Sequence, residues 1–246
     1  MLIIEKPLLA SFHGLTPEQI QEGVVVSINK PYGWTSADVV RKVKFALQRQ
    51  MKIKEIKVGH AGTLDPLATG ILLICLGKAT KASDSLQSQE KEYIASIRLG
   101  ATTPSFDLEK EIDQTYPYAH ITKEAVHEAL RQMTGPQEQI PPQFSAKIVD
   151  GARAYQWARS GVQTALMPAK IEIYQSHLMQ FNLPDIVVQI RCSKGTYIRA
   201  FARDLGALLQ SGGHLTGLVR SQNGQFKVEK ALTMEDFMKL FLLHCV

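Results

Sequence analysis

The chain has 246 residues, of which 45% are hydrophobic, so it can bury a sizeable core as one large domain or two small ones. Its 28 Lys and Arg outnumber 23 Asp and Glu, and the formal charge of +5 favours an anionic partner without identifying it. The three cysteines are widely spaced, which argues against a disulfide framework. No signal peptide and no apolar run of membrane-spanning length occur, which argues against secretion and membrane insertion. We therefore expect a cytoplasmic protein with reduced thiols.

The N-terminal third begins with a predicted helix and strand. Thr16, Pro17 and Gln19 supply a capping hydroxyl, a proline at the first helical position and a capping-box side chain. Gly23 is placed to end this helix. Residues 24–29 (VVVSIN) are mostly β-branched and predict a strand.

A polar turn and a basic helix follow. Residues 30–36 (KPYGWTS) predict a turn, and apolar residues recur at helical spacing from 38 to 50. Arg41 and Lys44 lie on other faces of that helix. A solvated charged surface is one interpretation, and contact with phosphate is the one that we favour.

The most informative stretch is the segment 59–70 (GHAGTLDPLATG). Its glycines and Pro66 predict a tight loop that holds Asp65 rigidly. The apolar run 71–76 (ILLICL) predicts a buried strand, which places the acid at the rim of a sheet, where sites form. An Asp-Pro pair that merely initiates a turn is the alternative, but His60 adds a polar group that folding alone does not require.

The middle of the chain predicts structural elements, followed by a second candidate RNA-binding region. Period-two alternation over residues 92–100 predicts a strand with Tyr93 on its apolar face, and Thr122 caps a helix that Gly135 is placed to end. Residues 139–147 are aperiodic, and cations then interleave with aromatics from Arg153 onward. A plain surface loop is the alternative to a region that grips unpaired bases.

The C-terminal part predicts two strands, at 170–174 and 186–192, and then a helix with Arg199 on a polar face. The segment 212–221 is glycine-rich and predicts a flexible stretch before a short strand at 225–228. A last helix begins after Thr233, with Asp236 in the capping-box position, and no repeat or linker interrupts the chain. We therefore expect one α+β domain.

Three chemistries suit a rigid loop aspartate on a basic protein. An aspartyl phosphatase needs a second nearby carboxylate for Mg²⁺, and none follows Asp65. A glycosidase needs a carboxylate pair, and no local partner occurs. A single acid that acts on a base or a ribose is the third.

Five stretches resemble, in order, the motifs of the bacterial TruB-type tRNA pseudouridine synthases: 30–36, 59–70, 91–93, 193–199 and 218–220. The resemblance runs from about residue 24 to residue 228 and is far more specific than any single motif. It implies a mixed, mainly antiparallel sheet with flanking helices and a central RNA-binding cleft. It also implies one catalytic domain over 1–246 and a thumb-like RNA-binding insertion near 141–161.

The implied reaction needs no metal and no cofactor. By resemblance Asp65 is the nucleophile that attacks the target uridine, at either the base or C1′. Arg199 would keep that acid ionised, because an opposing cation favours the charged form. Tyr93 would stack on the flipped base and help to move the C5 proton.

The resemblance also implies the substrate contacts. His60 would stabilise the opened loop of the RNA, and Tyr197 and Leu218 would line the base pocket. The remaining predicted RNA contacts are Lys30, Arg41, Lys44 and Arg153. We expect three departures from the family. Ala61 replaces a common threonine, and residues 103–107 (TPSFD) differ from the usual sequence, which puts an RNA contact by that loop in doubt. The third is the absence of the family's usual C-terminal PUA domain.

The expected substrate is uridine 55 in the T-loop of tRNA, and the expected partner is the T-arm stem-loop. We expect a monomer that works without a membrane or a guide RNA. A tRNA-binding folding chaperone without catalysis is the alternative, which an intact Asp65, Tyr93 and Arg199 disfavour. A guide-dependent synthase is a weaker alternative.

Overall fold

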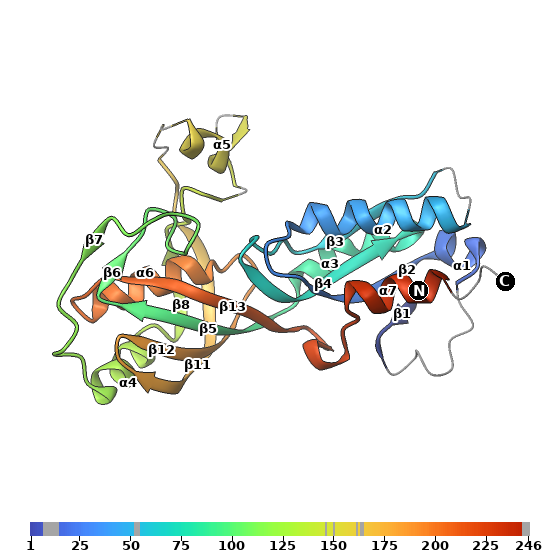
Figure 1. Cartoon of the computed structure of the whole chain (residues 1–246). Coiled ribbons are helices and arrows are strands. Elements are labelled where there is room, and N and C mark those ends of the chain that lie inside the picture. Colours follow the sequence, from blue (N-terminus) through green and yellow to red (C-terminus); the bar gives the residue numbers. More distant parts are fainter. Residues whose placement is uncertain are drawn as a thin grey trace. The chain divides into compact units, whose positions relative to one another are not determined.

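The computed structural model describes residues 1–6, 15–51, 55–145, 147–149, 151–160, 162 and 165–242. The chain forms two compact units: unit 1 is Met1–Glu92 with Val219–Val246, and unit 2 is Tyr93–Leu218. Figure 1 labels most of their helices and strands. Two strands, β5 (Lys91–Leu99) and β13 (Gly213–Asn223), contribute residues to both units.

Unit 1 is built on a mixed sheet. Besides the end of β13, its strands are β1 (Leu2–Ile4), β2 (Val24–Lys30), β3 (Val58–Ala61), β4 (Ala68–Leu76) and β14 (Phe226–Lys227). The order is β1-β2-β4-β13, with β3 also paired to β4 and β14 to β13. β1 is parallel to β2, whereas β2 and β3 are antiparallel to β4. The apolar run predicted at 71–76 is thus a fully buried part of β4.

The helices of unit 1 cover this sheet. They are α1 (Pro17–Glu22), α2 (Ser36–Met51), the 3₁₀ helix η2 (Gly77–Ala82), α3 (Ser83–Ser88), the 3₁₀ helix η3 (Val228–Lys230) and α7 (Met234–Leu242). The predicted capping box of α1 is confirmed, because the Gln19 amide donates to Thr16 Oγ1 and the Thr16 amide to Gln19 Oε1, at 3.2 and 2.9 Å. Gly23 ends α1 with a φ of +115°.

Helix α2 begins two residues before the predicted start, because a second capping box forms there. The Thr35 amide donates to Asp38 Oδ2 at 2.8 Å, and the Asp38 amide donates to Thr35 Oγ1 at 3.1 Å. The apolar face of α2 is buried and packs against β3 and α7. The opposite face carries the predicted cations.

Unit 2 has its own antiparallel strands and helices. They are β6 (Ala101–Thr102), β7 (Gln114–Thr115), α4 (Lys123–Gln132), β8 (Gly135–Gln139), β9 (Ile148–Val149), β10 (Ala152–Arg153), α5 (Ala154–Arg159), β11 (Ala169–Asn182), β12 (Asp185–Cys192) and α6 (Ile198–Leu208). The order in the sheet is β13-β5-β12-β11-β8, and β6-β7 and β9-β10 form small sheets of their own. The α+β class with a mixed, mainly antiparallel sheet is confirmed.

The alternation predicted for β5 is also confirmed. Tyr93, Ala95, Ile97 and Leu99 are buried, and the residues between them are more exposed. Thr122 caps α4 by accepting a hydrogen bond from the Ala125 amide at 3.2 Å. Local patterns therefore predicted these two elements correctly.

The prediction of a flexible stretch at 212–221 is wrong, because most of it lies in β13. Its glycines permit close packing. A Cβ on Gly213 would lie 2.5 Å from the carbonyl oxygen of Ala202, and one on Gly212 would lie 2.6 Å from the Tyr116 ring. Seven further strands, β1, β3, β6, β7, β8, β9 and β10, were not predicted, and β11 extends eight residues beyond its predicted end at 174.

Gly70 allows β4 and β13 to approach each other. Its φ is +99°, and a Cβ there would lie 2.3 Å from the carbonyl oxygen of Arg220. Gly33 has a similar φ of +79° but nothing within 4 Å of the Cβ position. Alanine substitutions at Gly70 and Gly33 therefore separate the cost of the backbone conformation from the cost of a steric clash with Arg220.

We predict that Gly70→Ala lowers the free energy of unfolding by more than about 3 kcal/mol, since backbone must move as well as adopt a left-handed conformation that costs about 1 to 2 kcal/mol. Gly33→Ala should cost only the conformational part. Urea unfolding followed by circular dichroism measures both. Equal losses in the two variants would show that the approach of Arg220 adds nothing.

Candidate active site

Asp65 lies in the connection between β3 and β4. The loop is shorter than the predicted 59–70, because Gly59, His60 and Ala61 belong to β3. Asp65 is half-buried, and its carbonyl accepts a hydrogen bond from the Ala68 amide at 3.1 Å. The Asp65 loop, residues 62–67, is therefore a tight turn between two paired strands.

The turn 31–35 and the first residue of α2 hold this loop from one side. The Gly33 amide donates to the Pro66 carbonyl at 2.9 Å. The Ser36 hydroxyl accepts from the Leu64 amide at 2.9 Å and donates to the Leu64 carbonyl at 3.2 Å. The residues on both sides of Asp65 are thus fixed by hydrogen bonds from distant parts of the sequence.

Lys30 adds a buried cation beneath the same loop. Its side chain is fully buried, and its Nζ donates to the carbonyls of Pro31, Trp34 and Pro66 at 2.9, 2.5 and 3.2 Å. The sequence groups Lys30 with the RNA contacts. Its burial instead gives it a structural role, because all three ammonium donors bind backbone oxygens.

Burial lowers the pKa of Lys30 from 10.5 to about 8, because the charged ammonium loses its hydration. The negative charge of Asp65 opposes this shift, and the positive charge of Arg220 adds to it. Lys30 is therefore close enough to Asp65 for the two charges to attract each other. Near neutral pH the lysine is a cation.

Arg220 on β13 holds the loop from the other side. It is almost completely buried, with its Nε donating to the Ile71 carbonyl at 2.7 Å. Its two terminal nitrogens donate to the carbonyls of Thr63 and Gly62 at 3.4 and 3.0 Å. One guanidinium thus joins the start of the Asp65 loop to β4. The sequence pointed to residues 218–220 as a motif but not to this contact.

His60 lies on β3, just before the loop. Its pKa is lowered, first because the ring is buried and second because Arg220 carries a positive charge. Its Nδ1 is buried without a hydrogen-bond partner in the described part of the chain. The structure thus gathers Lys30, His60, Asp65 and Arg220 in unit 1.

Arg199 lies on α6 in unit 2 and is not on an exposed polar face. Its side chain is 4% exposed, and its Nε lies 3.7 Å from the Asp107 carboxylate, which is 7% exposed. Its terminal nitrogens donate to the carbonyls of Ser105 and Phe144 at 3.3 and 2.9 Å. The loop 103–107 therefore anchors Arg199, a contact that the sequence did not predict.

Three more predicted residues belong to unit 2. Tyr93 is buried on β5, and Leu218 is half-buried on β13. Tyr197 precedes α6, and Gln139 binds its backbone twice, accepting from its amide at 2.8 Å and donating to its carbonyl at 3.1 Å. Tyr197 is therefore held by its backbone, and its ring is half-buried.

The remaining predicted RNA contacts lie on helices and hairpins. Arg41 and Lys44 are exposed on α2, and Arg41 forms an ion pair with Asp38. The side chain of Arg153 lies outside the described residues, although its backbone belongs to β10. The basic surface of α2 is thus available to an anionic partner.

The described part of the chain holds no group of three or more His, Cys, Asp or Glu side chains that could bind a metal ion. Cys75 and Cys192 are buried free thiols, and Cys245 lies outside the described residues. Within those residues no helix has both the length and the apolarity of a membrane span. The chemistry that this arrangement offers comes from an acid on a rigid loop with cations beneath it.

Comparisons with known proteins point to one family. The family model described as "TruB family pseudouridylate synthase (N terminal domain)" matches residues 48–198. The tRNA pseudouridine synthase B of Bacteroides fragilis is 54% identical over 217 residues, which cover 88% of this chain and 93% of that protein. The enzyme of the same name from Flavobacterium johnsoniae is 46% identical over 224 residues, covering 91% of this chain and 98% of that protein.

A solved structure titled "Crystal Structure of a Cbf5-Nop10-Gar1 Complex" also resembles this protein. The TM-score is 0.67 at 25% identity, and the match covers 92% of this chain. The chain spans 58% of that structure's chain.

The lowered pKa of Lys30 predicts a pH dependence of stability. Between about pH 8 and 10.5 the unfolded chain holds the lysine proton and the folded chain does not, so unfolding takes up a proton. The free energy of unfolding therefore rises with pH in this window, by up to about 3 kcal/mol from this group. Urea unfolding at a series of pH values should show that Lys30→Met lacks this part of the rise.

Lys227→Met, which removes an exposed charge from the same unit, is the matched control and should follow the wild type. Parallel curves for Lys30→Met and the wild type would contradict the prediction.

Proposed function

The chain belongs to the TruB family of pseudouridylate synthases, and we propose that it converts a uridine of tRNA to pseudouridine. Relatives named tRNA pseudouridine synthase B align with about nine tenths of the chain. The single structural observation that carries the proposal is the rigid Asp65 loop, which Gly33, Ser36, Lys30 and Arg220 hold by hydrogen bonds.

The target that we propose is uridine 55 in the T-loop, bound as part of the T-arm by a monomer that needs no guide RNA. The support is the resemblance of five motifs to the bacterial tRNA enzymes and the identity of 46 to 54% to proteins of that name. The alternative of a tRNA-folding chaperone without catalysis is not favoured, because these relatives are named as synthases.

The proposed reaction is an isomerisation that needs no co-reactant. The bond between N1 of the uracil and C1′ of the ribose breaks, and a bond between C5 and C1′ forms. C5 loses its proton and N1 ends with one, so atoms and electrons balance. Asp65 acts as the nucleophile, which requires its carboxylate form. The buried Lys30 ammonium lies close enough to attract that carboxylate, and this attraction opposes the larger effect of burial, which lowers the pKa of Lys30.

We assign two residues of unit 2 to the same reaction. Arg199 supplies a positive charge that favours the ionised nucleophile, and Asp107 positions the Arg199 guanidinium through their buried ion pair. Tyr93 stacks on the target base and assists removal of the C5 proton. Removing the Asp107 carboxylate would take an anionic partner away from a buried cation, which is costly.

The target base must leave the stacked T-loop before it can react. Flipping costs a few kcal/mol, and each base–aromatic stack contributes about 1 to 3 kcal/mol, so contacts with Tyr93 and Tyr197 can offset it. His60 holds the opened loop, and the lowered pKa of its imidazole means that it does so as a neutral group near pH 7. Leu218 supplies an apolar wall.

Phosphate contacts would supply most of the affinity. The exposed cations Arg41 and Lys44 on α2 suit this role, and Arg153 in the region 141–161 is the third candidate. These residues carry charge without reading sequence, so they position the RNA and leave recognition to the loop.

We predict that Asp65→Asn abolishes tritium release from tRNA that carries 5-³H-uridine. The amide keeps the size of the side chain but cannot act as a nucleophile, so the single-turnover rate should fall by at least about 10⁴-fold, the scale seen when a covalent nucleophile is lost. Asp84→Asn, an exposed acid on α3, should release tritium at the wild-type rate.

Filter binding should give Asp65→Asn nearly the wild-type affinity for tRNA, which separates lost chemistry from lost binding. A transcript with cytidine in place of uridine 55 should release no tritium. Full activity of Asp65→Asn would eliminate the nucleophile, and release from the substituted transcript would eliminate the proposed target.

A further inference from the structure

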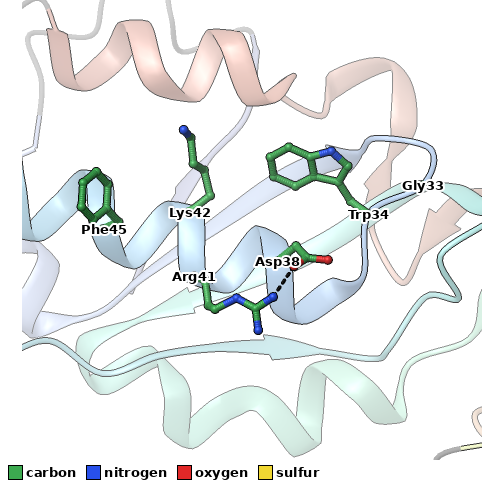
Figure 2. Close-up of a pocket in the computed structure, with 6 residues that line it drawn as sticks. All are labelled: Gly33, Trp34, Asp38, Arg41, Lys42 and Phe45. Atoms are coloured by element: carbon green, nitrogen blue, oxygen red, sulfur yellow. Dashed lines mark hydrogen bonds and ion pairs between the residues drawn. The ribbon is translucent and has the colours of Figure 1, made fainter.

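A shallow depression of about 550 Å³ lies where the turn before α2 meets the exposed face of that helix. Figure 2 shows the side chains around it. The residues that line it are Gly33, Trp34, Asp38, Arg41, Lys42 and Phe45. Its size falls in the range of sites that hold a small organic group.

The depression presents two aromatic rings to solvent. Phe45 is 57% exposed, on the side of α2 opposite its buried face. Trp34 is half-buried. In Figure 2 the Lys42 side chain rises between the two rings. Asp38, Arg41, Lys42 and Phe45 recur at spacings of three and four, so they share one face of α2.

The charge of this face favours an anion. Helix α2 carries Arg41, Lys42, Lys44 and Arg49, and its one acid, Asp38, is already engaged. The Asp38 carboxylate accepts hydrogen bonds from Thr35, which lower its pKa, and pairs with Arg41. The depression therefore combines aromatic faces with a net positive charge, which suits a nucleotide better than an apolar peptide.

The depression is directly connected to the Asp65 loop. Gly33, which lines it, donates its amide to the Pro66 carbonyl at 2.9 Å. The Lys30 ammonium bridges the carbonyls of Trp34 and Pro66. A group bound here would lie within unit 1, against a turn that is hydrogen-bonded to the loop that carries the nucleophile.

We propose that this depression binds an unpaired nucleotide of the substrate RNA other than the target uridine. Its base stacks on Phe45, and its phosphate lies against Lys42. The inference rests on the proposed function, because it takes tRNA as the ligand. It adds an anchor that acts on binding and leaves the chemical step to Asp65.

The test measures tRNA affinity by filter binding in Phe45→Ala, Phe45→Trp and Phe45→Leu. Loss of one stack should weaken binding by about 5- to 100-fold in the alanine variant. Tryptophan should restore the affinity, and leucine, which is apolar but cannot stack, should not. Tyr174→Ala is the matched control, because Tyr174 is also exposed and also lies beside a cation, Arg191, at 6.0 Å. It should bind as the wild type does.

Two further measurements address the phosphate and the indole. Lys42→Ala should reduce the dependence of log affinity on log salt by about one unit, and the exposed Lys227→Ala should not. Trp34 is one of two tryptophans in the chain, so a Trp157→Phe background makes it the sole reporter. Addition of tRNA should then quench its fluorescence.

Equal affinities of wild type and Phe45→Ala would overturn the inference, and so would full affinity of Phe45→Leu, which would indicate apolar docking of another kind. Tritium release is measured on the same samples. If the wild type forms pseudouridine and the Phe45 changes have no effect, the inference fails alone. If tRNA binds through Phe45 and no tritium is released, the proposed function fails and the binding site stands.

Discussion

Two buried cations that bind backbone carbonyls hold the loop that carries Asp65. In the described part of the chain every hydrogen-bond partner of the Arg220 guanidinium is a carbonyl, at Gly62, Thr63 and Ile71. The Lys30 ammonium likewise binds three carbonyls. A buried charge is costly unless its donors are satisfied, so these cations are stable only while the loop keeps its shape. The loop and the cations therefore fix each other.

This arrangement places positive charge near an acid, and within the described residues the hydrogen bonds of both cations go to neutral carbonyls. The same charge lowers the pKa of His60. In the proposed reaction the buried cations thus attract the anionic nucleophile and favour the neutral form of the histidine.

The sequence predicted those elements whose signals are local. The capping box of α1 and the alternation of β5 depend on residues a few positions apart, and both are confirmed. β13 depends on contacts that no local pattern reveals. Its glycines read as a flexible segment, but they lie against Ala202 and Tyr116, which are near them only in the folded chain.

The difference between local patterns and long-range contacts also explains which parts of the site could be predicted from the sequence. Glycines and Pro66 predicted a rigid loop around Asp65, because their conformational effects are local. The motif resemblance pointed to Arg199 but not to its partner Asp107, which is distant in sequence. Lys30 was grouped with the RNA contacts because it begins the polar motif 30–36. Its burial depends on the Pro66 carbonyl, 36 residues away.

The claim that the buried cations position the nucleophile is tested most directly by Arg220→Lys. Lysine keeps the charge but cannot match the fixed fork with which the guanidinium reaches three carbonyls. The account predicts that tRNA binds this variant with nearly wild-type affinity. The single-turnover rate of pseudouridine formation should fall about 100-fold, as expected when a reacting group moves by about 1 Å. A wild-type rate in Arg220→Lys would contradict the account.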